Sequence, residues 1–229
     1  MEYVMKDLLK KYRHGWILLY FFPYCAWFIY LETAKFDFYE IRCSVDDYIP
    51  SIDLFVIPYL LWFVYVALTV SVFFFTDRTD FYRCTAFLFI GMTICLTIFT
   101  LFPSTFDRGE EFSDATICGF LVRLIHRIDS NTNVFPSIHC FNSIVCTITY
   151  LKSNTFRTTK NSTKKQKSRN RMVKAASAIL TVLICLSTVF IKQHSVLDFF
   201  GASALALIMY PFIYKISWKR KNALEPSVK

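Results

Sequence analysis

Two histidines stand beside polar residues in an otherwise apolar chain. His139 ends the stretch FPSIH, and His194 precedes Asp198 by four positions in KQHSVLD. Residues four apart share one helical face, where a carboxylate can orient an imidazole ring and stabilise its developing positive charge. A neutral imidazole held in this way is a nucleophile, and a second imidazole can transfer protons. We therefore expect phosphoryl transfer through a phosphohistidine, with His194 as nucleophile, Asp198 as its partner and His139 as general acid.

The same two stretches are expected to begin helices. Pro136 suits the first turn of a helix, which would place Ser137 and His139 at a helix amino terminus. Helix amino termini bind phosphate, because their amides are unpaired and the helix dipole is positive there. We expect Arg108 and Lys192 to add positive charge. Ser137 fits a phosphate contact and a helix cap equally well.

Helices that position these residues must cross a membrane, because 55% of the residues are hydrophobic and 18% are aromatic. A membrane span needs roughly 20 apolar residues. Six runs are long enough, and they predict an all-α polytopic protein. The predicted spans are Trp16–Phe36, Ser51–Phe75, Phe81–Phe102, Val134–Leu151, Met172–Ile191 and Ser195–Trp218.

The positive charges predict the orientation of the spans. Most of the 26 Lys and Arg residues fall on one side if the amino terminus is cytoplasmic, including a basic loop at 152–174 that contains no acidic residue. Positive loops stay in the cytoplasm, so both termini are expected there and the two histidines outside. The net charge of +9 therefore reports topology, and a nucleic-acid partner is not expected.

The segment between the third and fourth spans predicts a further helix. Ile117, Leu121, Leu124, Ile125 and Ile128 have the spacing of one apolar helical face. Such a helix is expected to lie in the membrane interface rather than to cross it. The whole chain, 1–229, is interpreted as a single membrane domain with its catalytic part at about 81–218.

Motifs in the second half of the chain resemble those of the type 2 phosphatidic acid phosphatase superfamily, which has the signatures K-x6-R-P, P-S-G-H and S-R-x5-H-x3-D. Residues 136–139 read PSIH, and residues 187–198 keep Ser187, His194 and Asp198 at the family spacing. The resemblance implies a six-span fold with an external active site. It also implies the same roles for His194, Asp198 and His139, with Arg108 as a phosphate ligand.

The chain departs from these signatures at four positions. Gly109 follows Arg108 where the family has proline, and Leu101 stands in place of the lysine. Ile138 replaces the glycine of the second signature, and Thr188 replaces the arginine of the third. These departures resemble the lipid phosphotransferase branch, related to inositol phosphorylceramide and sphingomyelin synthases, and also bacterial phosphatases. Lys192 is a candidate replacement for one lost cation.

The sequence therefore predicts a membrane phosphatase for a lipid phosphate ester, such as phosphatidate, phosphatidylglycerophosphate or a prenyl diphosphate. Transfer of the phosphoryl headgroup to an alcohol is an alternative, and a proton-coupled transporter is a more distant one. No cofactor or metal is expected, and the partners are a lipid substrate and the bilayer. Residue usage is compatible with a bacterial cytoplasmic membrane.

Two other groups of residues are interpreted without chemistry. The eight cysteines lack metal-site spacing, and most of them fall within apolar runs. Asp46 and Asp47 are interpreted as solvated loop acids.

Overall fold

The computed structural model describes residues 10–109 and 112–215. It is 73% helical, which confirms the predicted all-α class. In chain order the elements are η1 (Arg13–Tyr20), α2 (Phe21–Thr33), β1 (Tyr39–Glu40), η2 (Asp46–Tyr48), η3 (Asp53–Phe55), α3 (Val56–Thr76), α4 (Arg78–Leu101), β2 (Ser104–Thr105), α5 (Ile117–Ile128), α6 (Ile138–Lys152), α7 (Lys164–Phe190) and α8 (Val196–Lys215).

Five helical segments among the described residues are long and apolar enough to cross a membrane. They are Lys10–Thr33, Asp53–Thr76, Arg78–Leu101, Lys164–Phe190 and Val196–Lys215. Each of the five overlaps a predicted span. Several long apolar helices of this kind are typical of an integral membrane protein. The remaining predicted span corresponds to α6, whose 15 residues are fewer than the roughly 20 that cross a hydrocarbon core. The six-span topology stays a prediction.

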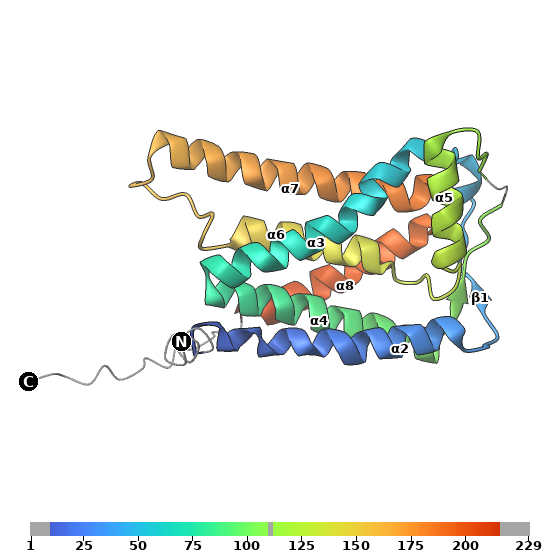
Figure 1. Ribbon diagram of the computed structural model, residues 1–229, viewed down its shortest axis with the longest axis horizontal. Helices are drawn as coiled ribbons and strands as arrows, with labels where there is room; N and C mark the ends of the chain where they lie inside the picture. The colour runs from blue at the N-terminus through green and yellow to red at the C-terminus, as the bar shows by residue number, and fades with distance from the viewer. Residues whose placement is uncertain (1–9, 110–111, 216–229) are drawn as a thin grey trace, which may run out of the picture.

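The short helix α6 packs against four longer ones, α3, α4, α7 and α8 (Figure 1). Small polar side chains join it to α3 and α7. Thr147 Oγ1 of α6 lies 2.8 Å from Thr181 Oγ1 and 3.1 Å from Ser177 Oγ of α7. The Tyr65 hydroxyl of α3 lies 2.6 Å from the same Ser177 oxygen. Small polar residues allow close approach of membrane helices, so this cluster fixes α6 between its neighbours.

Helix α4 approaches α6 closely at Gly91. A Cβ atom placed on Gly91 would lie 1.9 Å from Cζ of Phe141, whose ring is fully buried. We expect Gly91→Ala to lower the melting temperature in detergent, because overpacking typically costs about 1–3 kcal/mol. The neighbouring variant Ile90→Ala, at a side chain that is 50% exposed, is the control. Equal losses of melting temperature in the two variants would show that the packing of α4 against α6 does not require glycine at position 91.

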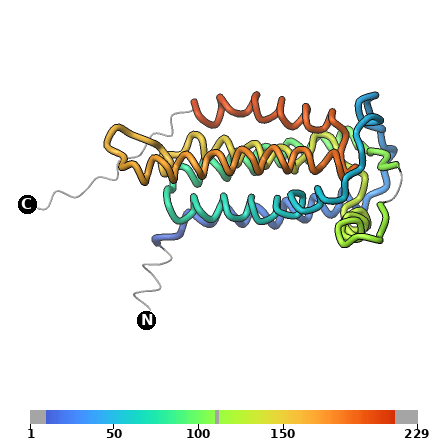
Figure 2. Tube along the Cα trace, turned by 90° about the horizontal axis from the view of Figure 1, so that it is seen from above, coloured from blue at the N-terminus to red at the C-terminus, as the bar shows by residue number. Residues whose placement is uncertain are grey.

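The two ends of the helix bundle differ. Helix α5 lies across the end where α2, α4 and α7 finish and where α3, α6 and α8 begin (Figure 1). The opposite end carries the start of η1, the α6–α7 connection and the end of α8 (Figure 2). The basic residues that open α7 therefore lie far from α5, at the other end of the bundle.

The predicted basic loop at 152–174 is too long. Helix α6 continues to Lys152, and α7 begins at Lys164 rather than at Met172. The reason is a capping box, in which the side chains of Thr163 and Gln166 satisfy each other's backbone N–H groups. The lysines, arginines and glutamine that follow are good helix formers, so the polar run extends the helix.

Helix α5 exists as predicted, but its apolar residues do not form one exposed face. Val122 is fully buried, and Leu121 and Ile125 pack beside it against the start of α3. Ile117 and Ile128 are instead 81% and 77% exposed. The predicted apolar residues share one helix, but the middle of their face covers the end of the bundle while its two ends are exposed. Contact of the exposed ends with a bilayer stays a prediction.

Candidate active site

The amino-terminal ends of α6 and α8 are joined by a backbone hydrogen bond. The Ser137 hydroxyl accepts a hydrogen bond from the Cys140 N–H at 3.3 Å, which makes Ser137 the cap of α6. The N–H of Ser137 donates to the carbonyl oxygen of Asp198 at 3.3 Å. The expectation that Pro136 lies in the first turn is wrong, because the helix begins at Ile138, after this cap.

His194 lies in the turn that precedes α8 and is bonded to the first turn of that helix. Its Nδ1 atom is 3.0 Å from Oδ2 of Asp198, and this oxygen also accepts the Ser195 N–H at 3.1 Å. Asp198 is fully buried and His194 is 7% exposed. A carboxylate accepts hydrogen bonds, so Nδ1 carries the proton and Nε2 keeps its lone pair. This is the tautomer that a nucleophilic histidine requires.

His139 faces His194 from the first turn of α6. The two ring centroids are 5.8 Å apart, with an angle of 61° between the ring planes. The His139 ring also packs against two aromatic residues of α3, with centroid distances of 4.6 Å to Tyr59 and 4.3 Å to Trp62. Packing on two sides fixes the orientation of the ring. Both imidazoles therefore lie at the same end of the bundle and in contact range.

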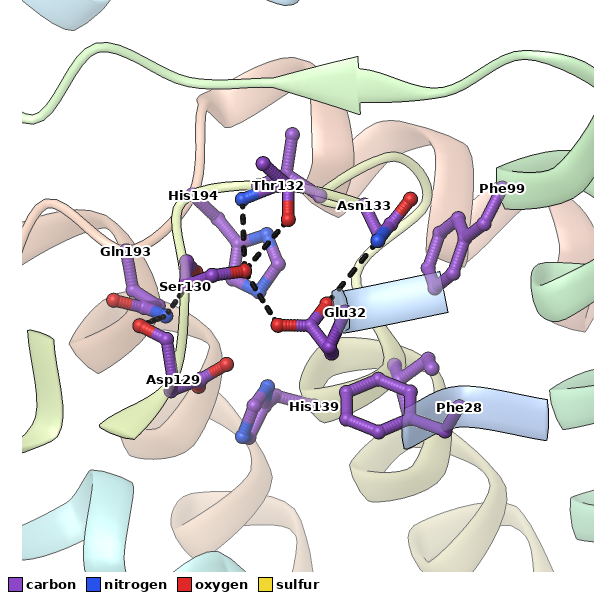
Figure 3. Close-up of a pocket in the computed structure, with 12 residues that line it drawn as sticks. Phe28, Glu32, Phe99, Asp129, Ser130, Thr132, Asn133, His139, Gln193 and His194 are labelled. Carbon is purple, nitrogen blue, oxygen red and sulfur yellow. Dashed lines mark hydrogen bonds between the residues drawn. The ribbon is translucent and has the colours of Figure 1, made fainter. Parts of the chain in front are cut away.

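A small pocket lies beside the two imidazoles (Figure 3). Its volume is about 40 Å³, which is space for roughly three water molecules and so for a small group rather than a whole lipid. Helices α2, α4 and α6 and the loops before α6 and α8 contribute its walls. The lining residues are Phe28, Glu32, Phe99, Asp129, Ser130, Thr132, Asn133, Val134, Ile138, His139, Gln193 and His194.

Two carboxylates line this pocket. Glu32 accepts hydrogen bonds from the Ser130 hydroxyl and, at 3.1 Å, from Nδ2 of Asn133 (Figure 3). Asp129 accepts a hydrogen bond of 2.6 Å from the Tyr59 hydroxyl. None of the described residues that line the pocket is a lysine or an arginine. Besides the two carboxylates, the polar groups of the walls are the two imidazoles, the hydroxyls of Ser130 and Thr132 and the amides of Asn133 and Gln193.

The predicted phosphate ligands Arg108 and Lys192 both bond to backbone carbonyls in this structure. Arg108 donates to the carbonyl oxygens of His126 and Asp129, at 2.8 and 2.6 Å. Lys192 donates to two carbonyl oxygens of the segment before α3. Burial lowers the pKa of Arg108. Partial burial of the ammonium group also lowers the pKa of Lys192. Contact of either residue with phosphate stays a prediction.

The comparison with protein families identifies the chain. The model of the PAP2 superfamily matches residues 103–222, more than half of the 229-residue chain. The chain belongs to the PAP2 superfamily. The matched range contains His139, His194 and Asp198, the residues that the structure brings together. No curated protein and no solved structure matches the chain.

Members of the PAP2 superfamily are generally phosphatases, so this membrane protein is phosphatase-like and, at the coarse level, a phosphoric ester hydrolase. The pair of imidazoles is the part of the structure that suits this chemistry. Within residues 10–109 and 112–215, no group of three or more His, Cys, Asp and Glu side chains has the arrangement of a metal site.

Several pocket residues of this PAP2-superfamily protein were not singled out from the sequence. Glu32 had a usable signal, because a carboxylate near the end of an apolar span is costly and marks a functional site. Asp129, Asn133 and Gln193 had none, since they lie in polar loops among similar residues. Glu32 also lies before the matched range, so the pocket extends beyond the family's region of similarity.

The pH dependence of turnover should reflect the environment of His194. Burial by itself lowers the pKa of this imidazole, but the hydrogen bond and negative charge of Asp198 outweigh it, and the pKa is raised above 6.5. If His194 is the nucleophile, as predicted, attack requires its neutral ring, so kcat/KM is expected to fall with decreasing pH through a midpoint above 6.5.

The Asp198→Asn variant tests the cause of this midpoint. Its maximal rate should fall by about 10⁴-fold, because the wrong tautomer becomes favoured. The residual activity should have its acidic midpoint at lower pH, since the negative partner is gone. An unchanged midpoint in the variant would contradict the assignment of that midpoint to His194.

Proposed function

We propose that this protein hydrolyses a lipid phosphate monoester or diphosphate through a phosphohistidine intermediate. The observation that supports it best is the contact of His194, bonded to Asp198, with His139 beside a small pocket. Two imidazoles with different partners can take different roles, one as nucleophile and one as acid. The match to a superfamily of phosphatases supports the same reaction class.

The proposed first step transfers the phosphoryl group to the protein. Nε2 of His194 attacks phosphorus, the bond between phosphorus and the leaving oxygen breaks, and His139 gives that oxygen its proton. Asp198 stabilises the positive charge on the ring of His194. In the second step His139 removes a proton from water, the resulting oxygen attacks phosphorus, and the phosphorus–nitrogen bond breaks. Inorganic phosphate leaves and both histidines return to their starting states.

Arg108 is retained in the proposal as a ligand of the phosphate oxygens. Its guanidinium group has five N–H donors, and its bonds to His126 and Asp129 use two of its nitrogens. Asp129 lines the pocket, so this cation lies beside the pocket wall. Ser137 and Lys192 already act as a helix cap and a loop tether, and a contact of theirs with phosphate would add to those roles.

The proposed setting is a bacterial cytoplasmic membrane with the imidazoles on the outer side. In this topology α6 is the fourth of six spans and both termini are cytoplasmic. The basic start of α7 lies at the end of the bundle opposite to the imidazoles, which supports this orientation by the positive-inside rule. The lipid tail stays in the bilayer while the phosphate enters the pocket laterally.

A second candidate is transfer of the phosphoryl group to an alcohol. The carboxylates of Glu32 and Asp129 at the pocket favour it, because they accept hydrogen bonds from an incoming hydroxyl group. The intermediate and the roles of the histidines are unchanged, and only the group that attacks phosphohistidine differs.

The deciding experiment uses detergent-purified protein and a panel of phosphatidate, phosphatidylglycerophosphate and prenyl diphosphate, with chelator present. Release of inorganic phosphate supports hydrolysis, and a new phosphorylated lipid in the presence of alcohols supports transfer. The His194→Ala variant should do neither. Full activity in that variant, or no reaction of the wild-type protein with any member of the panel, would contradict the proposal.

A further inference from the structure

A segment before α3 holds the loop that carries His194. Residues 43–52 run between β1 and η3, and they bond to the loop in both directions. The Lys192 ammonium group donates to the carbonyl oxygens of Asp46 and Ile49, at 3.0 and 2.7 Å. Lys192 itself has a φ angle of 58°, which is uncommon for residues other than glycine. Residues 43–52 therefore help to hold the loop that carries His194 in one conformation.

Asp46 supplies the bonds in the other direction. Its Oδ2 atom accepts hydrogen bonds from the Ser195 hydroxyl at 2.7 Å and from the Cys43 N–H at 2.8 Å. Its Oδ1 atom accepts the N–H of Val196, the first residue of α8, at 2.9 Å. Asp46 is 4% exposed, so the expectation that it is a solvated loop acid is wrong. Although burial raises its pKa, these hydrogen bonds outweigh burial and keep the pKa low.

The contacts of Asp46 lead directly to the imidazole–carboxylate pair. Ser195 lies immediately after His194, and its N–H donates to the same Oδ2 atom of Asp198 that binds His194. Asp46 thus holds the side chain of the residue whose backbone helps to hold Asp198. A negative charge is also favourable at the amino terminus of α8. Loss of Asp46 would free Ser195 and Val196, and with them the geometry of the pair.

We propose that Asp46 is a positioning residue for His194, acting through Ser195 and the first turn of α8. This role rests on the proposed function of His194 as nucleophile. Asp46 lies outside the range that matches the PAP2 superfamily, so the chain's amino-terminal part adds this support to the family's catalytic region. Asp46 does not line the pocket, and it is expected to affect the rate of the chemical step rather than substrate affinity.

The test compares Asp46→Ala with Asp47→Ala. Asp47 is the adjacent residue, is exposed and pairs with Arg42. Asp46→Ala should lower kcat by about 100-fold with KM within about 2-fold of wild type, because small misplacement of a reacting group has effects of this size. Asp47→Ala should leave both constants unchanged. A rise in KM with unchanged kcat, or equal effects of the two variants, would overturn the proposal.

The conservative variant Asp46→Asn distinguishes positioning from charge. Its amide oxygen can accept the Val196 N–H and its amide nitrogen can donate to the Ser195 hydroxyl, but the Cys43 N–H loses its acceptor, so part of the lost kcat should return. If Asp46→Ala does not fold, Ser195→Ala replaces it, since this change removes only the hydroxyl contact. A Ser195→Ala variant with wild-type kcat would then overturn the proposal.

A measurement without substrate separates this proposal from the proposed function. The chain has four histidines, so protein labelled at the imidazole rings gives few NMR signals. The signal of the Nδ1 proton between His194 and Asp198 is assigned as the one that disappears in His194→Asn. Asp46→Ala should shift or broaden this signal, and Asp47→Ala should not. An unchanged signal would overturn the positioning role even in an active enzyme. A shifted signal in a protein without phosphatase activity would retain the role and reject the proposed function.

Discussion

Replacing His194 with asparagine is expected to lower kcat/KM for a lipid phosphate by about 10⁴-fold or more, because loss of a nucleophile removes the covalent route. Asparagine retains a polar group of similar size next to Asp198 but cannot attack phosphorus. The wild-type protein, quenched in alkali during turnover of labelled substrate, should carry acid-labile phosphate on a histidine. His194→Asn should carry none.

His14 offers the matched control for this loss. It is also buried, but it lies near the start of η1, at the end of the bundle opposite to the pocket, where its Nε2 atom is 3.1 Å from the carbonyl oxygen of Phe74. His14→Gln keeps a donor at this place and should retain wild-type turnover and labelling. Labelled phosphate on His194→Asn, or an equal loss of turnover in His14→Gln, would contradict the assignment of the nucleophile.

The fold could be predicted from the sequence wherever a long apolar run decides the structure. The runs that became α3, α4 and α8 have this property, since a membrane forces a continuous helix on them. Helix α6 was predicted as a span like the others, but it has only 15 residues, and one of its polar side chains, Thr147, bonds to α7. The start of α7 was predicted at Met172, where the apolar run begins. The helix begins earlier, at Lys164, because Thr163 and Gln166 form a capping box.

The candidate site was predictable where its geometry is local in sequence. His194 and Asp198 are four residues apart, so helix periodicity alone brings them together. Their meeting with His139 follows from two parallel helix starts that share one end of the bundle. The contacts of Asp46 and Glu32 join residues about 100 or more positions apart in the sequence. Such contacts depend on how loops fold over the bundle end, which no periodicity specifies.

The hydrogen-bond partners of the two predicted phosphate ligands could not be predicted from the sequence either. Arg108 and Lys192 were singled out because phosphate needs positive charge, but charge does not specify a partner. Both lie close to the site and satisfy backbone carbonyls that loop geometry leaves unpaired. Their residue types were informative about the neighbourhood of the site. Their hydrogen-bond partners could only come from the three-dimensional arrangement.

The His139→Asn variant should lose activity in proportion to how much the leaving group needs a proton. For an alkyl lipid phosphate, kcat/KM is expected to fall by about 10²–10⁴-fold, the usual contribution of general acid catalysis. For an aryl phosphate with an acidic phenol, the loss should be much smaller, because a phenolate departs without protonation. The ratio of the two losses, measured in the same preparation, is independent of the amount of folded protein.

The second step distinguishes His139 from the nucleophile. His139 is also expected to deprotonate the attacking water, so with an aryl phosphate the His139→Asn variant should form phosphohistidine quickly and hydrolyse it slowly. A burst of phenol equal to the enzyme concentration, followed by slow turnover, would be the result. The packing of His139 against Tyr59 and Trp62 gives a structural alternative, in which asparagine merely loosens α3 and slows both substrates alike. Equal losses without a burst would therefore reject the acid–base role and leave His139 as a packing residue beside His194.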